Sequence, residues 1–206
     1  MKELVDRVVD LEWEFFQNVN NEGGRASCQD NRRTFDIMRK SQFKAWDADT
    51  LESYLSDLLA AKSAGENPLR EKYARMMEST DAAEYKKLEA KLPPVVAGKK
   101  QLVDDIVAIQ MPWQRDYARA YSRLATRARP VGSMSDRQYT TSVETYLRGE
   151  LLTYSEETLR RYLRHIRSVF EAGGNLTVAI MENTVKMYGY QSLQAAEDAI
   201  AASAEL

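Results

Sequence analysis

The sequence predicts an all-α protein: a single domain over residues 1–206, built as a helical bundle from two tandem four-helix units that a pseudo-twofold axis relates. Apolar residues recur three and four positions apart, which is the spacing of amphipathic helices, and the alternation typical of strands is nearly absent. Glycines and helix-capping residues separate the periodic segments. The order of these landmarks in the first half of the chain returns in the second half.

The first unit is expected over residues 4–78. Its four helices are expected at 4–19, 35–46, 50–64 and 68–77. Asp47 offers capping chemistry for the third helix, Gly65 ends it, and Asn67 followed by proline starts the fourth. Residues 79–101 hold two prolines around a short charged segment, so we interpret them as a connector.

The second unit is expected over residues 102–188, with a closing helix at 192–204. Leu102-Val103-Asp104 repeats Leu4-Val5-Asp6 at an offset of 98 residues. Further on the offset is 108, and the matches are Thr50 with Thr158, Tyr54 with Tyr162, Gly65 with Gly173 and Asn67 with Asn175. About ten extra residues near 117–129 account for the change of offset. These matches favour an ancestral duplication. The alternative is that ordinary helix-capping and helix-breaking residues occur at similar spacings in the two halves by chance.

Composition limits the classes of function. The net charge is -2, so charge implies no nucleic-acid partner. The single cysteine rules out an internal disulfide and fits a reducing compartment. No apolar run approaches the roughly 18 residues of a membrane helix, and residues 1–3 lead directly into an amphipathic helix rather than a signal peptide. We therefore expect a cytoplasmic protein without membrane partners. The single histidine, His165, is expected in solvent, and no metal site is predicted.

Four polar residues stand at the centres of otherwise apolar helix faces. Glu12 and its repeat counterpart Gln110 form one pair, and Gln42 with its counterpart Glu150 forms the other. A polar group facing a core costs several kcal/mol unless it is satisfied. These four residues therefore predict a polar pocket between the two halves, with Glu12 and Glu150 as its acids. The alternative is a buried structural network of hydrogen bonds.

A loop after the first helix carries dense polar chemistry. It contains Asn20, Asn21, Glu22, two glycines, Arg25, Ser27 and Cys28. The Arg25 guanidinium can bind a carboxylate or phosphate in bidentate fashion, and we expect it to anchor an anion. Cys28 is either a nucleophile with a lowered pKa or a small buried hydrophobe.

Further candidates for substrate binding share the inward helix faces or lie at their edges. They are Arg39, Gln42, Gln110, Tyr146, Arg148, Tyr154 and Asn183. The tyrosines can equally be core residues with a hydrated hydroxyl group, and Asn183 can equally be structural.

Several strings resemble an uncharacterised bacterial family, domain of unknown function 4125. They are Glu12-Trp13-Glu14-Phe15-Phe16, the loop from Val19 to Gln29, the segment from Phe35 to Gln42, and Glu144-Thr145-Tyr146-Leu147-Arg148-Gly149-Glu150-Leu151. The resemblance covers nearly the whole chain and implies a bacterial cytoplasmic protein. It also implies small-molecule metabolism, because some relatives are joined to a nucleotidyltransferase-like domain. It supplies no reaction.

Two functions remain open. The first is a cofactor-independent enzyme on a small polar, anionic metabolite such as an amino acid or a derivative, of lyase, isomerase, hydrolase or group-transfer type. Glu12 or Glu150 would be its general acid or base, with a pKa raised by burial. The second is a non-catalytic helical module that binds a ligand, a nucleotidyltransferase-like partner domain or a second copy of itself.

Overall fold

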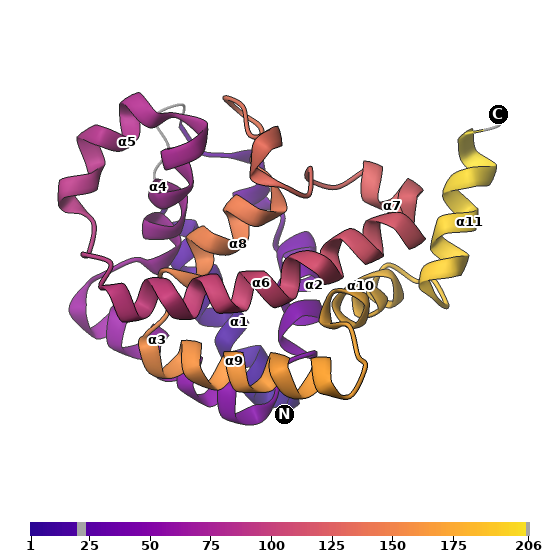
Figure 1. Ribbon diagram of the computed structural model, residues 1–206, viewed down its shortest axis with the longest axis horizontal. Helices are drawn as coiled ribbons and strands as arrows, with labels where there is room; N and C mark the ends of the chain where they lie inside the picture. Colours follow the sequence, from indigo (N-terminus) through magenta and orange to yellow (C-terminus); the bar gives the residue numbers. More distant parts are fainter. Residues whose placement is uncertain (20–23, 205–206) are drawn as a thin grey trace.

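The computed structural model describes residues 1–19 and 24–204, and this part of the chain is all-helical (Figure 1). The helices of the first half are α1 (Lys2–Gln17), α2 (Arg32–Phe43), α3 (Ala48–Ala64), α4 (Pro68–Thr80) and α5 (Ala82–Leu88), with the 3₁₀ helices η1 (Ser27–Asp30) and η2 (Glu89–Lys91). Those of the second half are α6 (Ala97–Ala120), α7 (Ser122–Thr126), η3 (Ser133–Ser135), α8 (Val143–Leu151), α9 (Glu156–Glu171), α10 (Leu176–Met187) and α11 (Leu193–Ala204). None of these helices is long and apolar enough to traverse a lipid bilayer.

Helix ends follow the capping chemistry of the sequence. The Asp47 side chain accepts a hydrogen bond from the Thr50 N–H at the start of α3. After α3 and α9 the chain turns through Gly65 and Gly173, whose φ angles of 71° and 73° lie in the left-handed region that favours glycine. These caps explain why the breaks between helices were predictable.

Asparagines open α4 and α10 in the same way. Asn67 caps α4, and its amide also donates a hydrogen bond of 2.9 Å to the Phe15 carbonyl at the end of α1. Asn175 caps α10 and donates at 3.3 Å to the Trp113 carbonyl in α6. Asn67 therefore fixes α4 to α1, and Asn175 fixes α10 to α6.

Several boundaries differ from the prediction. α1 ends at Gln17, and α2 ends at Phe43, so Trp46 lies in the following turn, where it is nevertheless buried. α6 begins at Ala97, which shortens the connector, and Pro112 lies inside this helix. His165 is not in solvent, because the ring is half-buried and its Nε2 lies 3.0 Å from the Ala45 carbonyl oxygen.

The two halves pack through the same set of helix pairs. α1 contacts α2, α3 and α4, and α6 contacts α8, α9 and α10. Across the boundary, α3 contacts α9, while α4 packs on α8 and α10 packs on α2. The halves therefore interlock, since α4 of the first half lies against α8 and α10 of the second half lies against α2.

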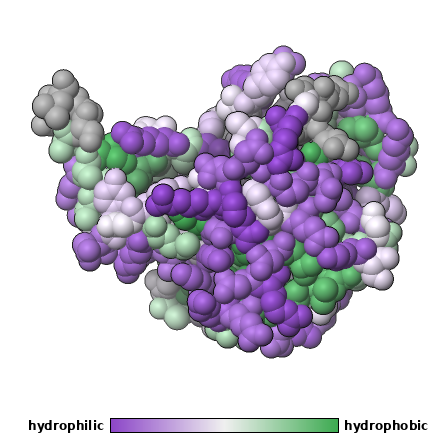
Figure 2. Space-filling view, turned by 180° about the vertical axis from the view of Figure 1, so that it is seen from behind, coloured by the Kyte–Doolittle hydropathy of each residue, from purple (hydrophilic) through white to green (hydrophobic). Residues whose placement is uncertain are grey.

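One apolar core runs through both halves. Its most deeply buried members include Val8, Phe43, Leu58, Ile106 and Ile166, all with no exposed surface. A second, smaller cluster joins α6 and α10 to the projecting helix α11. The face in Figure 2 is largely hydrophilic, with apolar patches beside this projection.

Candidate functional site

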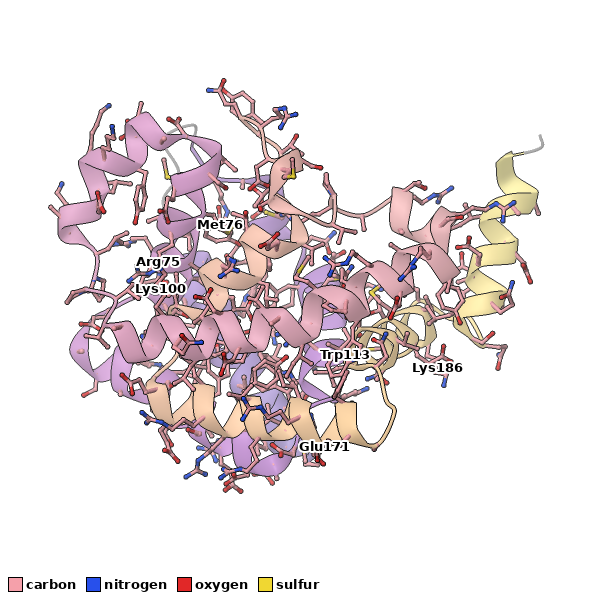
Figure 3. All side chains as sticks on the ribbon, viewed as in Figure 1. Arg75, Met76, Lys100, Trp113, Glu171 and Lys186 are labelled. Carbon is pink, nitrogen blue, oxygen red and sulfur yellow. The ribbon has the colours of Figure 1, made fainter. Side chains whose placement is uncertain are left out.

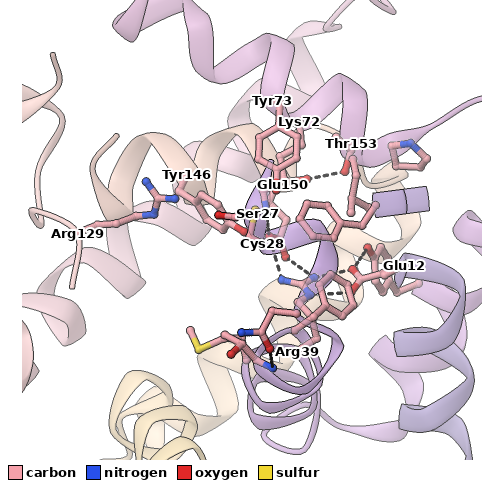
Figure 4. Close-up of a pocket in the computed structure, with 18 residues that line it drawn as sticks. Glu12, Ser27, Cys28, Arg39, Lys72, Tyr73, Arg129, Tyr146, Glu150 and Thr153 are labelled. Carbon is pink, nitrogen blue, oxygen red and sulfur yellow. Dashed lines mark hydrogen bonds and ion pairs between the residues drawn. The ribbon is translucent and has the colours of Figure 1, made fainter. Parts of the chain in front are cut away.

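A pocket of about 590 Å³ opens between α1, η1, α2 and α4 of the first half and α8 of the second (Figure 4). Its lining residues are Glu12, Phe16, Ser27, Cys28, Asn31, Thr34, Phe35, Met38, Arg39, Tyr54, Pro68, Leu69, Lys72, Tyr73, Arg129, Tyr146, Glu150 and Thr153. All three residues predicted as catalytic, Glu12, Cys28 and Glu150, are among them.

Arg39 joins the two predicted acids. Its Nε and Nη2 donate to the two oxygens of Glu12 at 2.6 and 2.5 Å, which is the bidentate geometry of a strong ion pair. Its Nη2 and Nη1 also donate to Glu150 at 3.0 and 3.2 Å, and Nη1 donates to Gln42 at 2.9 Å. Dashed lines in Figure 4 mark bonds among these side chains.

Glu150 accepts hydrogen bonds from several groups besides Arg39. Lys72 Nζ donates to Oε2 at 2.5 Å, and Gln42 and the Tyr154 hydroxyl group donate to Oε1 at 3.0 and 2.7 Å. Burial by itself would raise the pKa of Glu150, but the positive charges of Arg39 and Lys72 hold it well below its ordinary value. The expectation of a raised pKa is therefore wrong for Glu150, which is an ionised member of a charge network.

Lys72 is the main site residue that the sequence analysis missed. It is buried, and its Nζ lies 3.5 Å from the centroid of the Tyr146 ring in addition to its bond to Glu150. Arg129, from the segment before α8, lies with its guanidinium carbon 5.0 Å from the same ring. The predicted residue Tyr146 therefore contacts two cations at once.

Aromatic side chains form a wall of the pocket. Phe16 and Phe35 are stacked with centroids 5.3 Å apart, and Tyr73 lies 6.5 Å from Phe16. Burial is the largest cause that raises the pKa of Tyr73, followed by the nearby Tyr146 hydroxyl group. The wall therefore presents three aromatic rings and the neutral hydroxyl group of Tyr73 to any bound molecule.

The polar loop reaches the pocket with two residues. Gln29 is buried and holds the loop, because its amide donates to the carbonyl oxygens of Phe16 and Val19 at 2.8 and 3.0 Å. This anchor brings the adjacent Ser27 and Cys28 to the pocket, with Cys28 exposed rather than buried.

Other loop residues do not line the pocket. Arg25 is exposed, donates to Asp30 at 2.8 Å and also bonds Gln17, and it is not among the residues that line this pocket, so its role as an anion anchor stays a prediction. Asn20, Asn21 and Glu22 lie outside the described residues.

Of the remaining predicted residues, some belong to the charge network around Arg39 and Glu150, and others lie elsewhere in the fold. Gln42 and Tyr154 belong to the network through Glu150. Arg148 bonds Asp104 at 2.6 Å and lines a different pocket, and Asn183 donates to the Ser41 carbonyl at 3.1 Å.

Gln110 does not join the network either, although its contact repeats that of Glu12. The Tyr54 hydroxyl group donates to Glu12 at 2.6 Å, and Gln110 donates to the Tyr162 hydroxyl group at 2.6 Å. The positions in the second half that match Arg39 and Lys72 at an offset of 108 carry Leu147 and Ile180. The charged partners of the site are thus absent together from the second half.

Among the described residues, no group of three or more His, Cys, Asp and Glu side chains could hold a metal ion. Glu12 and Glu150 are both engaged by Arg39 rather than open to a shared ligand.

The comparisons with known proteins give one finding. A family model described as "Protein of unknown function (DUF4125)" matches residues 2–198. No curated protein and no solved structure matches the chain. The resemblance that the loop and the first helices indicated is confirmed over nearly the whole chain.

Proposed function

The chain belongs to the DUF4125 family of proteins of unknown function, and from the chemistry of its pocket we propose that it binds a small organic anion. The observation that carries this proposal is that the protein's own side chains pair both carboxylates of the pocket but leave two of its cations partly unpaired. Both carboxylates are neutralised by the protein itself, whereas two cations remain able to contact a ligand.

The carboxylates have little capacity left for a ligand. Glu12 accepts three hydrogen bonds, two from Arg39 and one from Tyr54. Glu150 accepts five, from Arg39, Lys72, Gln42 and Tyr154. All the N–H groups of Arg39 face these acceptors, so Arg39 is also fully engaged.

Lys72 and Arg129 are only partly engaged. The Lys72 ammonium has three N–H groups, of which one bonds Glu150 and another faces the Tyr146 ring. Arg129 is exposed and makes one hydrogen bond, of 3.2 Å, to the Thr141 carbonyl. With Glu12, Glu150 and Arg39 also counted, the charges of the described lining residues sum to +1, which favours an anion.

The walls favour an organic anion over a bare inorganic one. Phe16, Phe35 and Tyr73 offer flat apolar surface, and a pocket of about 590 Å³ is the size of a small-molecule site. We therefore propose a carboxylate or phosphate joined to an apolar or aromatic body.

The sole cysteine gives a direct assay, because Cys28 lines the pocket. A library of organic carboxylates and phosphates is screened for molecules that slow alkylation of Cys28 by iodoacetamide, which is uncharged. We expect protection by anionic members. Arg129→Gln should weaken the apparent Kd of a protecting compound about tenfold, corresponding to about 1.4 kcal/mol.

Arg127→Gln is the matched control, because Arg127 is exposed, two residues away and outside the pocket lining. It should leave protection unchanged. Equal protection by neutral analogues, or equal Kd values in Arg129→Gln and the wild type, would contradict the proposal.

The second candidate is the cofactor-independent enzyme of lyase, isomerase or group-transfer type. It is supported by one observation, which is that Glu12, Cys28 and Glu150 line one pocket. On this alternative the bonds of Glu12 to Arg39 and Tyr54 loosen when substrate binds, which frees a carboxylate for proton transfer.

Glu12→Gln tests the enzyme. The amide keeps the shape, and an amide already occupies the matching position at Gln110. If Glu12 transfers a proton, turnover of a compound found in the screen should fall by about 100- to 10,000-fold, while circular dichroism remains that of the wild type. Full activity in Glu12→Gln beside an inactive, folded Cys28→Ala would instead assign the chemistry to the thiol.

We also propose that the two halves arose by duplication and are related by a pseudo-twofold axis. The support is the repeated set of helix pairs, the matching Asn67 and Asn175 contacts, and the matching Tyr54 and Tyr162 contacts. On this proposal the pocket lies between the halves, and only one of two ancestral sites kept its charges.

A further inference from the structure

A second pocket, of about 830 Å³, lies between the connector and helices α4, α6 and α8. It uses different residues of α4 and α8 from those that line the first pocket. Its charged and phenolic lining residues are Arg75, Glu78, Tyr85, Glu89, Lys100, Asp104 and Arg148. Figure 3 labels Arg75 and Lys100 in this region.

Arg75 is a buried cation with an unused donor. Its side chain is only 6% exposed. Nε bonds Glu71 at 2.7 Å and Nη2 bonds the Pro93 carbonyl at 2.8 Å, which ties the connector to α4. Nη1 makes no hydrogen bond to any described residue, although the side chain lines the pocket. A buried guanidinium with free N–H groups is a ready anchor for a carboxylate.

Lys100 is a second cation on the wall. It is in the first turn of α6, is exposed and forms no salt bridge within residues 1–19 and 24–204, whereas Arg75 pairs with Glu71 through Nε and Nη2 and keeps only Nη1 free. Arg148, by contrast, pairs with two acids, Asp104 at 2.6 Å and Glu144 at 3.4 Å. Arg75 and Lys100 are therefore the groups that an anionic end of a ligand would meet.

Two carboxylates supply the opposite charge. Glu78 and Glu89 line the pocket without an ion pair to any residue that the structure describes. Both act on Tyr85, whose pKa is raised first by burial and then by these two negative charges. A phenol ring beside two unpaired carboxylates suits an ammonium group, which gains both charge pairing and a cation–π contact.

We propose that this second pocket binds a small zwitterion, an amino acid or short peptide, with its carboxylate at Arg75 and Lys100 and its ammonium group at Glu78, Glu89 and Tyr85. Neither a simple anion nor a simple cation would satisfy both the unused donors of Arg75 and Lys100 and the unpaired carboxylates of Glu78 and Glu89. This site is independent of the anion pocket and does not rest on its function.

The test titrates the proteinogenic L-amino acids and their dipeptides with glycine into the ¹⁵N-labelled full chain, with amide chemical shifts as the readout. We expect shifts at residues of the second pocket, and compounds that shift only residues around Cys28 and Tyr146 would contradict the proposal. Lys100→Gln and Glu89→Gln alter exposed residues, so the fold should survive, and each should weaken Kd about fivefold, as expected for an exposed ion pair.

A modified ligand distinguishes the residues that bind the carboxylate from those that bind the ammonium group. The N-acetyl form of a binding compound lacks the ammonium group, so its weaker binding should respond to Lys100→Gln and not to Glu89→Gln. Lys186→Gln, outside both pockets, is the control. The proposal is overturned if no zwitterion shifts these signals, if the N-acetyl form binds as tightly, or if both variants keep the wild-type Kd.

Discussion

Arg39 is the residue on which the buried charges depend. It is 9% exposed, its guanidinium lies 4.7 Å from the centroid of the Phe43 ring, and its N–H groups satisfy Glu12 on α1, Gln42 on its own helix and Glu150 on α8. Burial alone would lower its pKa, but Glu12 and Glu150 raise it well above the ordinary value. Arg39 thus remains charged at neutral pH, and its bonds to Glu12 and Glu150 link the two halves.

Replacing one of the carboxylates that pair with Arg39 should show how much this charge network stabilises the fold. Glu150→Gln leaves Arg39 and Lys72 with a single buried counter-charge, and we expect the free energy of unfolding at neutral pH to fall by about 3–5 kcal/mol. The folded-state pKa of Glu150 is lowered, so its contribution to stability is complete above the ordinary carboxyl pKa of about 4.3. It is lost as the pH falls through the lowered folded-state value.

Urea unfolding at a series of pH values measures this effect. The difference between the wild type and Glu150→Gln should narrow below about pH 4.3. Glu157→Gln is the control, because that carboxylate is on the surface beside Arg161 and its loss should change stability little. A difference that stays constant down to the acid transition would show that the charge of Glu150 does not stabilise the fold.

The sequence revealed part of this site for a simple reason. Glu12, Gln42 and Glu150 stand at the centres of apolar helix faces, and helical periodicity is a local property. The sequence did not identify Lys72 as a site residue, because lysine is ordinarily found on a solvated helix face and its partner Glu150 lies 78 residues away in the sequence. Arg25 was misplaced for the complementary reason: the sequence could not tell that Asp30 and Gln17 would pair with it.

At the scale of elements, the contact between α4 and α8 depends on one glycine. A Cβ atom at Gly149 would lie 2.9 Å from Cγ of Met76 and 3.1 Å from the carbonyl oxygen of Lys72. The Met76 side chain can move, but the backbone oxygen belongs to α4 itself. Gly149 therefore sets the distance between the two helices that supply walls to both pockets.

Two glycine-to-alanine variants separate packing from helix propensity. Gly98→Ala, in α6, would place its Cβ no closer than 3.6 Å to Glu156, so it should raise the free energy of unfolding by up to about 1 kcal/mol. Gly149→Ala should lower it by about 1–3 kcal/mol, because overpacking outweighs the gain in propensity. Chemical denaturation compares the two. An equal increase in the free energy of unfolding of both variants would mean that α4 and α8 can move apart to accommodate the added methyl group at no cost.

At the scale of the whole molecule, the helix order was predictable and the packing partners were not. Gly65, Gly173, Asn67 and Asn175 mark helix ends through backbone geometry and capping, which act within a few residues. The same signals do not predict which helices pack against each other. The apolar faces of the helices could be buried in many different arrangements. The all-α class followed from the sequence, whereas the packing of α4 on α8 and of α10 on α2 did not.

The packing of α10 on α2 has a consequence for synthesis on the ribosome. α2 is complete once Phe43 has been made, but its partner α10 contributes Asn183, whose amide bonds the Ser41 carbonyl across 142 residues of sequence. The emerging first half therefore cannot bury all its apolar surface by itself. Contacts of such long range slow folding and leave apolar faces uncovered in the interval. The apolar face of α2 that α10 covers is thus completed only after translation has passed α10.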